Sequence, residues 1–242
     1  MKQSVNYKIY EPGKLLELAF PEDKIPLLQM QHLRMLDFPI SRNISYERTV
    51  DEFLLQLATN DSLRGLRNRK DLVILLNKEG AILREDGDWF LVFTPDQGEQ
   101  LTLEEDAPLY TVLRSLMKKE KDGQVCRVQI PDRSLRTLVS GIAPFSILDE
   151  YCRTQPGGYL AVAERIVYEG PDLLLGHVPV CRYGSLVTVD NEEIEKYNSI
   201  KTLLDDYIYQ FDHSDGEEKI QPLSIAVFGA PGCGKSFGVK QI

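Results

Sequence analysis

Hydrophobic and polar residues along this chain recur with the periods of helices and of strands. The clearest helical pattern follows Ser45, where apolar residues stand at positions i, i+3, i+4 and i+7 and form one face. These residues are Val50, Phe53, Leu54 and Leu57. Either Ser45 or Thr49 opens the helix, and Thr49–Glu52 fits a capping box, in which a hydroxyl and a carboxylate satisfy free backbone N–H groups. We therefore expect an amphipathic helix that starts at one of these two residues.

Further stretches have helical spacing or helix-end signals. They are Pro26–Leu36, Leu109–Leu116, Thr137–Arg153 with breaks at Gly141 and Pro144, and Asp190–Phe211. The first has a proline near its first turn, where the missing N–H costs nothing. The last has the best start, because Asp190 is a good cap and Glu193 stands at the capping-box position. We expect each stretch to be helical.

Short apolar stretches have the composition of strands. Asp71–Leu76 reads as a buried strand, and Val125–Ile130 as a strand closed by Pro131. Ala81–Arg84 and Trp89–Phe93 face each other across an Asp-Gly dipeptide, a strong hairpin signal. Later apolar runs lie between glycines and prolines and predict a few more short strands. These runs are Ala161–Val167, Leu173–Leu175 and Leu186–Val189.

This mixture of elements predicts an α/β fold. Gln155-Pro156-Gly157-Gly158 is a firm turn and marks an internal boundary, and Asp212–Gln221 is a short acidic linker. We therefore expect three parts. Residues 1–154 form an α/β region, residues 155–221 contain connecting strands, a helix and the linker, and residues 222–242 begin another domain.

Composition narrows the class of protein. The chain has 242 residues, of which 43% are hydrophobic and 27% charged, which is typical of a folded globular protein. Its net charge of −9 argues against nucleic acid or an anionic membrane as the main partner. Its four cysteines are widely spaced, which suits a reducing cytoplasm, and no stretch is apolar enough for secretion or membrane insertion.

Two groups of residues admit more than one interpretation. Basic residues gather in Ser62–Lys70 and are Arg64, Arg67, Arg69 and Lys70. They contact a phosphate or RNA, or they form a solvated helix end, which is the commoner arrangement. Tyr197, Tyr207 and Tyr209 are a stacking platform for bases or, as the negative charge favours, packing residues.

The most specific motif begins at Gly229. It follows Ile225–Phe228, an apolar run typical of a buried parallel strand, and it fits the P-loop pattern G-x-x-x-x-G-K-S/T. Its residues are Gly229, Ala230, Pro231, Gly232, Cys233, Gly234, Lys235 and Ser236. Chance produces this pattern in roughly 1% of chains of this length, and the preceding apolar run makes chance rarer still.

Phosphate chemistry explains these residue types. Glycines let backbone N–H groups approach phosphate oxygens, because no Cβ stands in the way. Lys235 would reach the β- and γ-phosphates, and the Ser236 hydroxyl would ligate Mg²⁺. The motif therefore predicts that ATP and Mg²⁺ bind at Gly229–Ser236.

The helix from Asp190, Pro222 and the motif together resemble the entry into an AAA-type ATPase domain. The resemblance implies ATP hydrolysis coupled to remodelling of a macromolecule, with an oligomer as the working form. Catalytic residues are not identified, because such ATPases need a later acidic residue and a water-positioning group. We therefore expect the upstream part of an ATPase, which alone binds nucleotide weakly and does not turn it over. We also expect Gly229–Ile242 to be poorly ordered, or Ile225–Phe228 to dock on a sheet edge.

Leu72–Ala81 and the hairpin after it resemble the C-terminal half of ribokinase-like sugar kinases, over about residues 20–95. There, a core strand leads into a glycine-rich turn and a small hairpin beside the nucleotide. Here Asn77 replaces the usual glycine, and no G-A-G-D motif follows the hairpin. The resemblance therefore implies a degenerate α/β relative that senses a ligand. Two alternatives remain beside the ATPase, namely a regulatory module that recognises a sugar or nucleotide, and a sugar kinase with an unidentified base.

Overall fold

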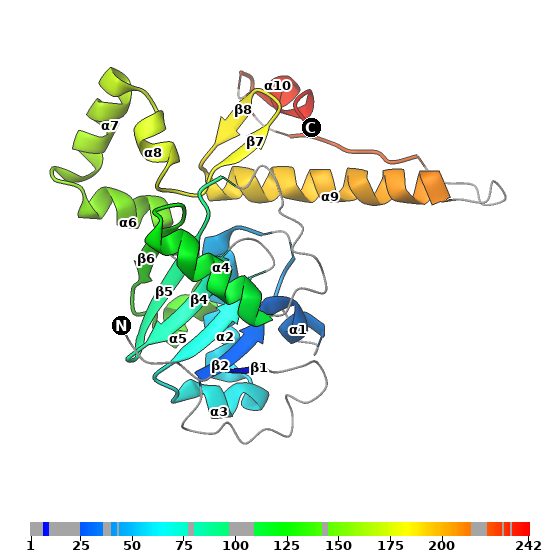
Figure 1. Cartoon of the computed structure of the whole chain (residues 1–242). Coiled ribbons are helices and arrows are strands. Elements are labelled where there is room, and N and C mark those ends of the chain that lie inside the picture. The colour runs from blue at the N-terminus through cyan, green and yellow to red at the C-terminus, as the bar shows by residue number, and fades with distance from the viewer. Residues whose placement is uncertain are drawn as a thin grey trace.

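The chain folds into a mixed α/β structure, seen here in a computed structural model (Figure 1). The structure describes residues 7–9, 25–35, 40–42, 44–76, 80–96, 109–141, 145–213, 222–228, 230–232 and 234–242. In this part of the chain, a six-stranded sheet has helices on both faces, and a separate two-stranded hairpin lies beside a long helix. The α/β class expected from the sequence is confirmed at this level.

The strands of the large sheet lie in their sequence order. They are β1 (Tyr7–Ile9), β2 (Ile25–Gln29), β3 (Leu72–Leu75), β4 (Gly80–Glu85), β5 (Asp88–Phe93) and β6 (Cys126–Ile130). The first three are parallel, and Leu28 of β2 pairs with Ile74 of β3. From β3 onward each strand is antiparallel to the next. The predicted strand at Asp71–Leu76 and the strand at Val125–Ile130 are both confirmed.

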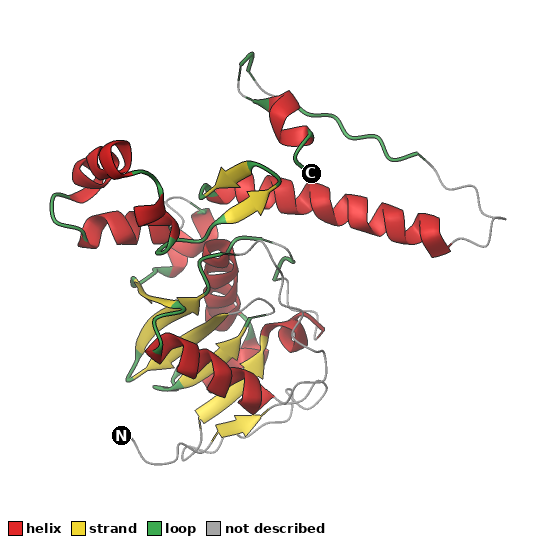
Figure 2. Cartoon of the chain, turned by 45° about the horizontal axis from the view of Figure 1, so that its top comes forward, coloured by secondary structure: helices red, strands yellow, loops and turns green. Residues whose placement is uncertain are grey.

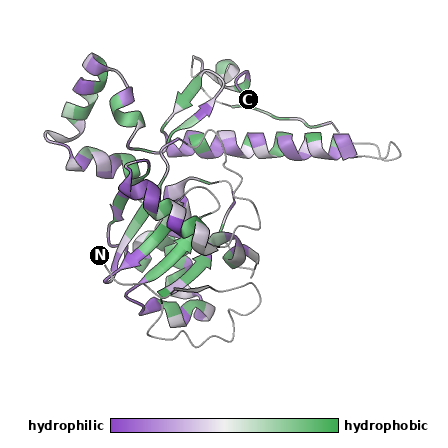
Figure 3. Cartoon of the chain, viewed as in Figure 1, coloured by the Kyte–Doolittle hydropathy of each residue, from purple (hydrophilic) through white to green (hydrophobic). Residues whose placement is uncertain are grey.

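Both faces of the sheet are buried. Leu72 and Ile74 of β3 belong to the core under helix α2 (Tyr46–Thr59), whereas Val73 and Leu75 belong to the core under helix α4 (Leu109–Lys121). Because successive side chains of a strand point to opposite faces, a strand covered on both sides has no polar position. Strand β3 is accordingly hydrophobic along its length, and β4 and β5 have charged residues only at their exposed hairpin end (Figure 3).

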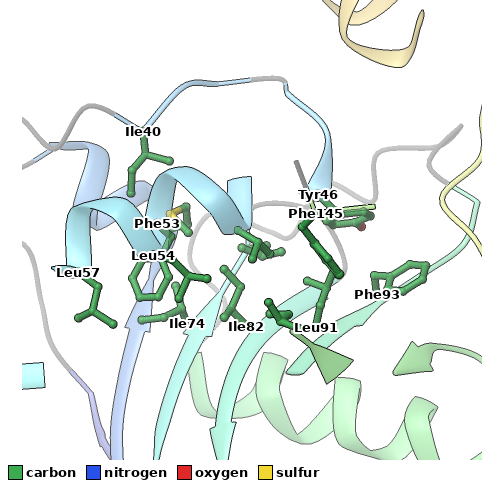
Figure 4. Packing of buried hydrophobic residues seen from close by; sticks show 14 of the residues in the cluster. Ile40, Tyr46, Phe53, Leu54, Leu57, Ile74, Ile82, Leu91, Phe93 and Phe145 are labelled. Carbon is green, nitrogen blue, oxygen red and sulfur yellow. The ribbon is translucent and has the colours of Figure 1, made fainter. Parts of the chain in front are cut away.

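Helix α2 supplies most of the apolar cover for one face. Ser45 is its N-cap, because the Ser45 side chain accepts a hydrogen bond from the N–H of Arg48. All four residues of the predicted apolar face are buried, and Phe53 and Leu54 pack over Ile74 (Figure 4). The capping box expected at Thr49 is wrong. Thr49 lies inside the helix, where its hydroxyl donates to the carbonyl of Ser45, since the earlier serine already satisfies the helix start.

The β4–β5 hairpin is confirmed with the turn that the sequence indicates. Asp86 and Gly87 both have positive φ, 53° and 103°, as a two-residue hairpin turn requires. The turn is also tied to the sheet, because Gly87 N donates to Lys70 O (3.0 Å) and Asp86 N donates to the Asp71 carboxylate (3.2 Å).

The other described elements are mostly short. They are α1 (Met30–Met35), a 3-10 helix (Asp61–Leu63), α3 (Arg64–Arg67), α5 (Leu135–Ser140), α6 (Ile147–Thr154), α7 (Gly158–Glu169), α8 (Asp172–Leu175), β7 (Cys181–Tyr183), β8 (Leu186–Thr188), α9 (Asn191–His213) and α10 (Lys235–Val239). The helices predicted before and after Gly141 correspond to α5 and α6, and the long helix capped by Asp190 is confirmed as α9. No helix within the described ranges has the length and apolar composition that a membrane crossing requires.

Two sequence predictions of local structure are wrong. Pro26–Gln29 is strand β2 rather than the start of a helix, because its apolar residues fit between β1 and β3. Ala161–Val167 and Leu173–Leu175 lie in helices α7 and α8 rather than in strands. In α7, Val162 is buried and Ile166 packs against the core one turn later, so the apolar residues follow a helical period.

Helix α9 joins the sheet to the C-terminal elements. It lies across the end of the sheet, beside the β7–β8 hairpin, in both views (Figures 1 and 2). Its first turns contact the start of α2, where the Ser45 hydroxyl donates to Glu195 Oε1 (2.7 Å) and Arg48 Nη1 pairs with Glu195 Oε2 (3.0 Å). Two helix starts that are distant in sequence are thereby held together.

A buried carboxyl group lies at the same junction. Glu47, in the first turn of α2, is only 2% exposed. Ile147 N donates to Glu47 Oε1 (3.3 Å), and the side chain of Asn191 also hydrogen-bonds to this carboxyl group, but Oε2 is buried without a partner. Burial raises the pKa of Glu47 from 4.5 to about 7, against the hydrogen bonds, which lower it. Glu47 is therefore protonated in the folded protein over a pH range in which the unfolded chain is charged.

We predict that Glu47→Gln stabilises the protein at alkaline pH. Between pH 4.5 and about 7 the folded state holds a proton that the unfolded state releases, so the contribution of Glu47 to stability is lost as the pH rises through 7. Glutamine has a similar shape without the charge, so the free energy of unfolding should rise by about 2 kcal/mol near pH 8 and by less near pH 5. Urea unfolding between about pH 5 and pH 8 measures this free energy, and Glu164→Gln, at an exposed position, is the control. If the free energy of unfolding of the parent chain, Glu47→Gln and Glu164→Gln depended equally on pH, Glu47 would not have the raised pKa.

Candidate functional site

The P-loop motif leads into the short helix α10. Gly232 and Gly234 have φ values of +81° and +78°, a region that glycine adopts without strain. Gly234 is the N-cap of α10, so Lys235 and Ser236 lie in its first turn. Ala230, Pro231, Gly232, Gly234 and Ser236 are exposed, and Gly229 and Cys233 lie outside the described residues. The described glycines thus have conformations that suit a phosphate-binding loop.

The strand expected before the loop is not formed, so the predicted strand-loop-helix unit is wrong in its first element. Residues 222–228 have no strand pairing. Ile225 and Val227 are 42% and 41% exposed, and Phe228 is 90% exposed. The reason is positional. This segment runs back along α9 on the side away from the large sheet (Figures 1 and 2), so it does not extend that sheet.

Helix α10 packs on α9 and on the β7–β8 hairpin instead. Gly238 is buried, and a Cβ at this position would meet the hydroxyl group of Tyr197 in α9. Beside it, the backbone N–H and the hydroxyl of Ser185, in the hairpin turn, both donate to Gln241 Oε1, at 2.7 and 2.9 Å. Residues 235–239 thus form an ordered helix on α9 and on the hairpin turn, and Ile225–Phe228 is not paired with a sheet edge as one alternative expected.

A small aromatic cluster supports this docking surface. Tyr183 of β7 and Tyr197 of α9 have ring centroids 5.1 Å apart, and both contact Ile194. The Tyr183 hydroxyl donates to Asn198 Oδ1 (2.8 Å), and burial raises the pKa of Tyr183. Tyr197 is thus a packing residue, as the negative charge of the chain favours. Its hydroxyl group and the adjacent ring atoms face Gly238. Tyr209, farther along α9, stacks on His213 with ring centroids 4.1 Å apart.

Asp190 caps α9 as predicted, but the capping box with Glu193 is not formed, because the N–H of Asp190 donates to the Thr188 hydroxyl oxygen (3.2 Å) instead. Asp190 Oδ1 accepts a hydrogen bond from Glu193 N (2.9 Å), and the Thr188 hydroxyl at the end of β8 donates to the Glu193 carboxylate (2.7 Å). These contacts fix the hairpin to the helix, and Glu195 fixes the helix to α2. The motif is therefore connected to the large sheet through side chains that the sequence analysis did not assign to the site. A signal was available for Gly238, because a glycine inside a helix indicates a close neighbour.

A metal ion at the motif would depend on the Ser236 hydroxyl and on phosphate oxygens. Within the described ranges, no three His, Cys, Asp or Glu side chains are close enough together to hold a metal ion. A serine hydroxyl is a hard oxygen ligand, which Mg²⁺ accepts together with phosphates and water. The residue type thus fits Mg²⁺ bound as its nucleotide complex.

Comparison with protein-family models, curated proteins and solved structures found no match to this chain. Arguments about its function rest on its own residues and geometry.

We predict that Gly238→Leu releases α10 from its docking surface. The added side chain would collide with Tyr197, and overpacking of this kind costs about 1–3 kcal/mol. Hydrogen exchange of residues 235–241 should become about tenfold faster, while exchange in β3 and β4 stays unchanged, because only local opening is affected. Gly176→Leu is the matched control, since open space surrounds Gly176. Unchanged exchange in Gly238→Leu would show that α10 does not dock there.

Proposed function

We propose that this chain binds Mg-ATP through Gly229–Ser236 and serves as part of a cytoplasmic ATPase. The glycines would let backbone N–H groups surround the phosphates. Lys235 would balance the charge of the β- and γ-phosphates, and Ser236 would hold Mg²⁺. Mg²⁺ held by Ser236 would supply positive charge against that of the phosphates.

The observation that carries the proposal is the motif together with its local conformation. The motif residues occur at the required spacing. Gly232 and Gly234 have positive φ, and Ser236 lies in the first turn of the helix that follows the loop. In a P-loop, the residue that ligates Mg²⁺ has this place, because the helix start and the loop face the same phosphates.

The exposed segment before the loop bears on affinity. A P-loop binds tightly when a buried strand holds its N–H groups in place beforehand. Here Ile225–Phe228 is apolar but exposed, so part of the binding energy would be used to order the loop. We therefore expect weak binding of nucleotide by the chain alone.

The cytoplasmic assignment is part of the same proposal. The described cysteines, Cys126, Cys152 and Cys181, form no disulfide bonds with one another. Free, partly or fully buried thiols suit a reducing compartment, where disulfides do not persist. ATP is also a cytoplasmic ligand, so the two parts of the proposal agree.

Lys235→Ala should abolish most of the binding of Mg-ATP. Loss of a hydrogen bond to a charged group costs about 1.5–3 kcal/mol, which corresponds to a roughly 10- to 150-fold increase in Kd. Isothermal titration with Mg-ATP measures this change. Ser236→Ala should remove the dependence on Mg²⁺ and leave weaker, metal-independent binding, because only the metal ligand is lost.

The control for this experiment is Lys240→Ala, which removes an exposed lysine just after α10 and keeps the same net charge as Lys235→Ala. It should bind Mg-ATP like the parent chain. If both lysine variants lose affinity equally, the attraction is a general effect of charge, and the proposed loop does not bind the phosphates.

A further inference from the structure

A cavity of about 260 Å³ lies at the end of the large sheet where the β4–β5 hairpin turns. Its walls come from α2, α3, the strand ends around the hairpin, and the segment from β6 into α5. Leu54, Leu57 and Leu135 provide apolar surface, and Trp89 provides an aromatic ring. Its size is slightly below that of usual small-molecule sites, which are about 300–1,000 Å³, so it suits a compact ligand.

The same cavity is lined by arginines that backbone carbonyl groups hold in place. Arg67 donates from Nε to Leu57 O (2.8 Å) and from Nη2 to Asn60 O (2.9 Å). Arg84 donates from Nε to Gly87 O (3.2 Å) and from Nη1 to Arg67 O (2.7 Å). Carbonyl groups orient a guanidinium group without neutralising it, so the positive charge remains for another partner.

Little negative charge among the described residues compensates these two arginines. Arg84 forms no ion pair with a described carboxylate, and Arg67 reaches only Asp61, at 3.6 Å, whose side chain is 94% exposed. An exposed pair of this kind contributes little. Asp132 also lines the cavity, but it is one carboxylate among three arginines. The wall therefore carries net positive charge in a chain whose net charge is −9.

The third arginine, Arg133, is largely buried beside the cavity. The Arg133 side chain is only 10% exposed and makes one ion pair, from Nη2 to Asp51 Oδ2 (3.0 Å). Asp51 Oδ2 is shared with Phe145 N, which donates to it at 3.1 Å. Arg133 Nε and Asp51 Oδ1 are both buried without a partner. Arg133 lines the cavity, so its guanidinium group adds positive charge to the wall that Asp51 compensates in part.

Trp89 links the cationic and apolar parts of the wall. The Arg84 guanidinium lies over the indole ring, 5.0 Å from its centroid, and Phe53 meets the same ring edge-on at 6.0 Å. The indole ring is thus fixed, with a positive charge beside it. A ligand with an anionic end and a short apolar body would match both parts of the wall at once.

We propose that this cavity binds a small organic anion, whose carboxylate or phosphate group contacts the arginines and whose apolar body lies against the leucines and Trp89. Because the arginines are already oriented, binding costs little side-chain entropy. The site is separate from the P-loop and goes beyond the proposed ATP binding. It also changes the interpretation of the basic cluster at Ser62–Lys70, of which Arg67 lines the cavity while Arg64 is exposed.

Trp89 makes the test direct, because it is the only tryptophan in the chain. Phenyl phosphate is titrated into the full chain while Trp89 fluorescence is recorded, with benzoate in a parallel arm and phenol as the uncharged analogue. We expect a saturable change with phenyl phosphate or benzoate at concentrations below about 10 mM, and none with phenol. The stronger of the two anions shows whether phosphate or carboxylate is preferred. No saturable change with either anion, or an equal change with phenol, would overturn the proposal.

Variants locate the binding. Arg67→Gln should weaken it at least about tenfold, as expected when a charged hydrogen-bond donor is lost, whereas Arg64→Gln on the same short helix should not. Ala58→Leu fills the cavity from α2 and leaves every arginine in place, so it should also weaken binding, even if Arg67→Gln fails to fold. Lys235→Ala should bind the anion normally, which separates this site from the P-loop. Equal affinity in Arg67→Gln or Ala58→Leu and the parent chain would contradict the assignment.

Discussion

The contact between Glu195 and the start of α2 is the interaction on which the arrangement of this protein depends. Glu195 accepts from the backbone N–H and the hydroxyl of Ser45, and it pairs with Arg48. Ser45 is only 2% exposed and also caps α2, so one serine serves two helices. An exposed ion pair alone would contribute little, but a carboxylate that satisfies buried donors is costly to remove. This contact fixes α9 relative to α2 and the large sheet. The β7–β8 hairpin and α10, which pack on α9, are thereby positioned as well.

Much of the fold could be predicted because local signals and tertiary packing agree. Leu72–Leu75 has no polar residue because both faces of its strand are covered. Asp86-Gly87 adopts the positive φ values that its hairpin needs, and Asp190 caps α9 by accepting a hydrogen bond from the N–H of Glu193. In each case a few adjacent residues contain the information, and nothing distant opposes it.

The rest depends on distant parts of the chain. Pro26–Gln29 becomes a strand because β1 and β3 lie on either side of it, and these four residues alone do not indicate either neighbour. Ile225–Phe228 has the composition of a buried strand, but it lies on the side of α9 away from the large sheet and pairs with no described strand. The cavity at Trp89 is formed by segments on α2, α3, β4, β5 and α5, so no single stretch of sequence could indicate it. The motif at Gly229–Ser236 could be recognised from the sequence because its defining residues lie within eight consecutive positions.

Alkylation of Cys233 tests the central claim, nucleotide binding at the motif, most directly. This cysteine lies within the loop sequence, and bound phosphates would shield its thiol, whereas the half-buried Cys126 provides an internal control in the same sample. Peptide mass spectrometry follows both thiols with and without Mg-ATP. At ATP concentrations ten times the Kd, alkylation of Cys233 should be about tenfold slower and that of Cys126 unchanged. An unchanged rate at Cys233 over all ATP concentrations would show that nucleotide does not occupy the loop.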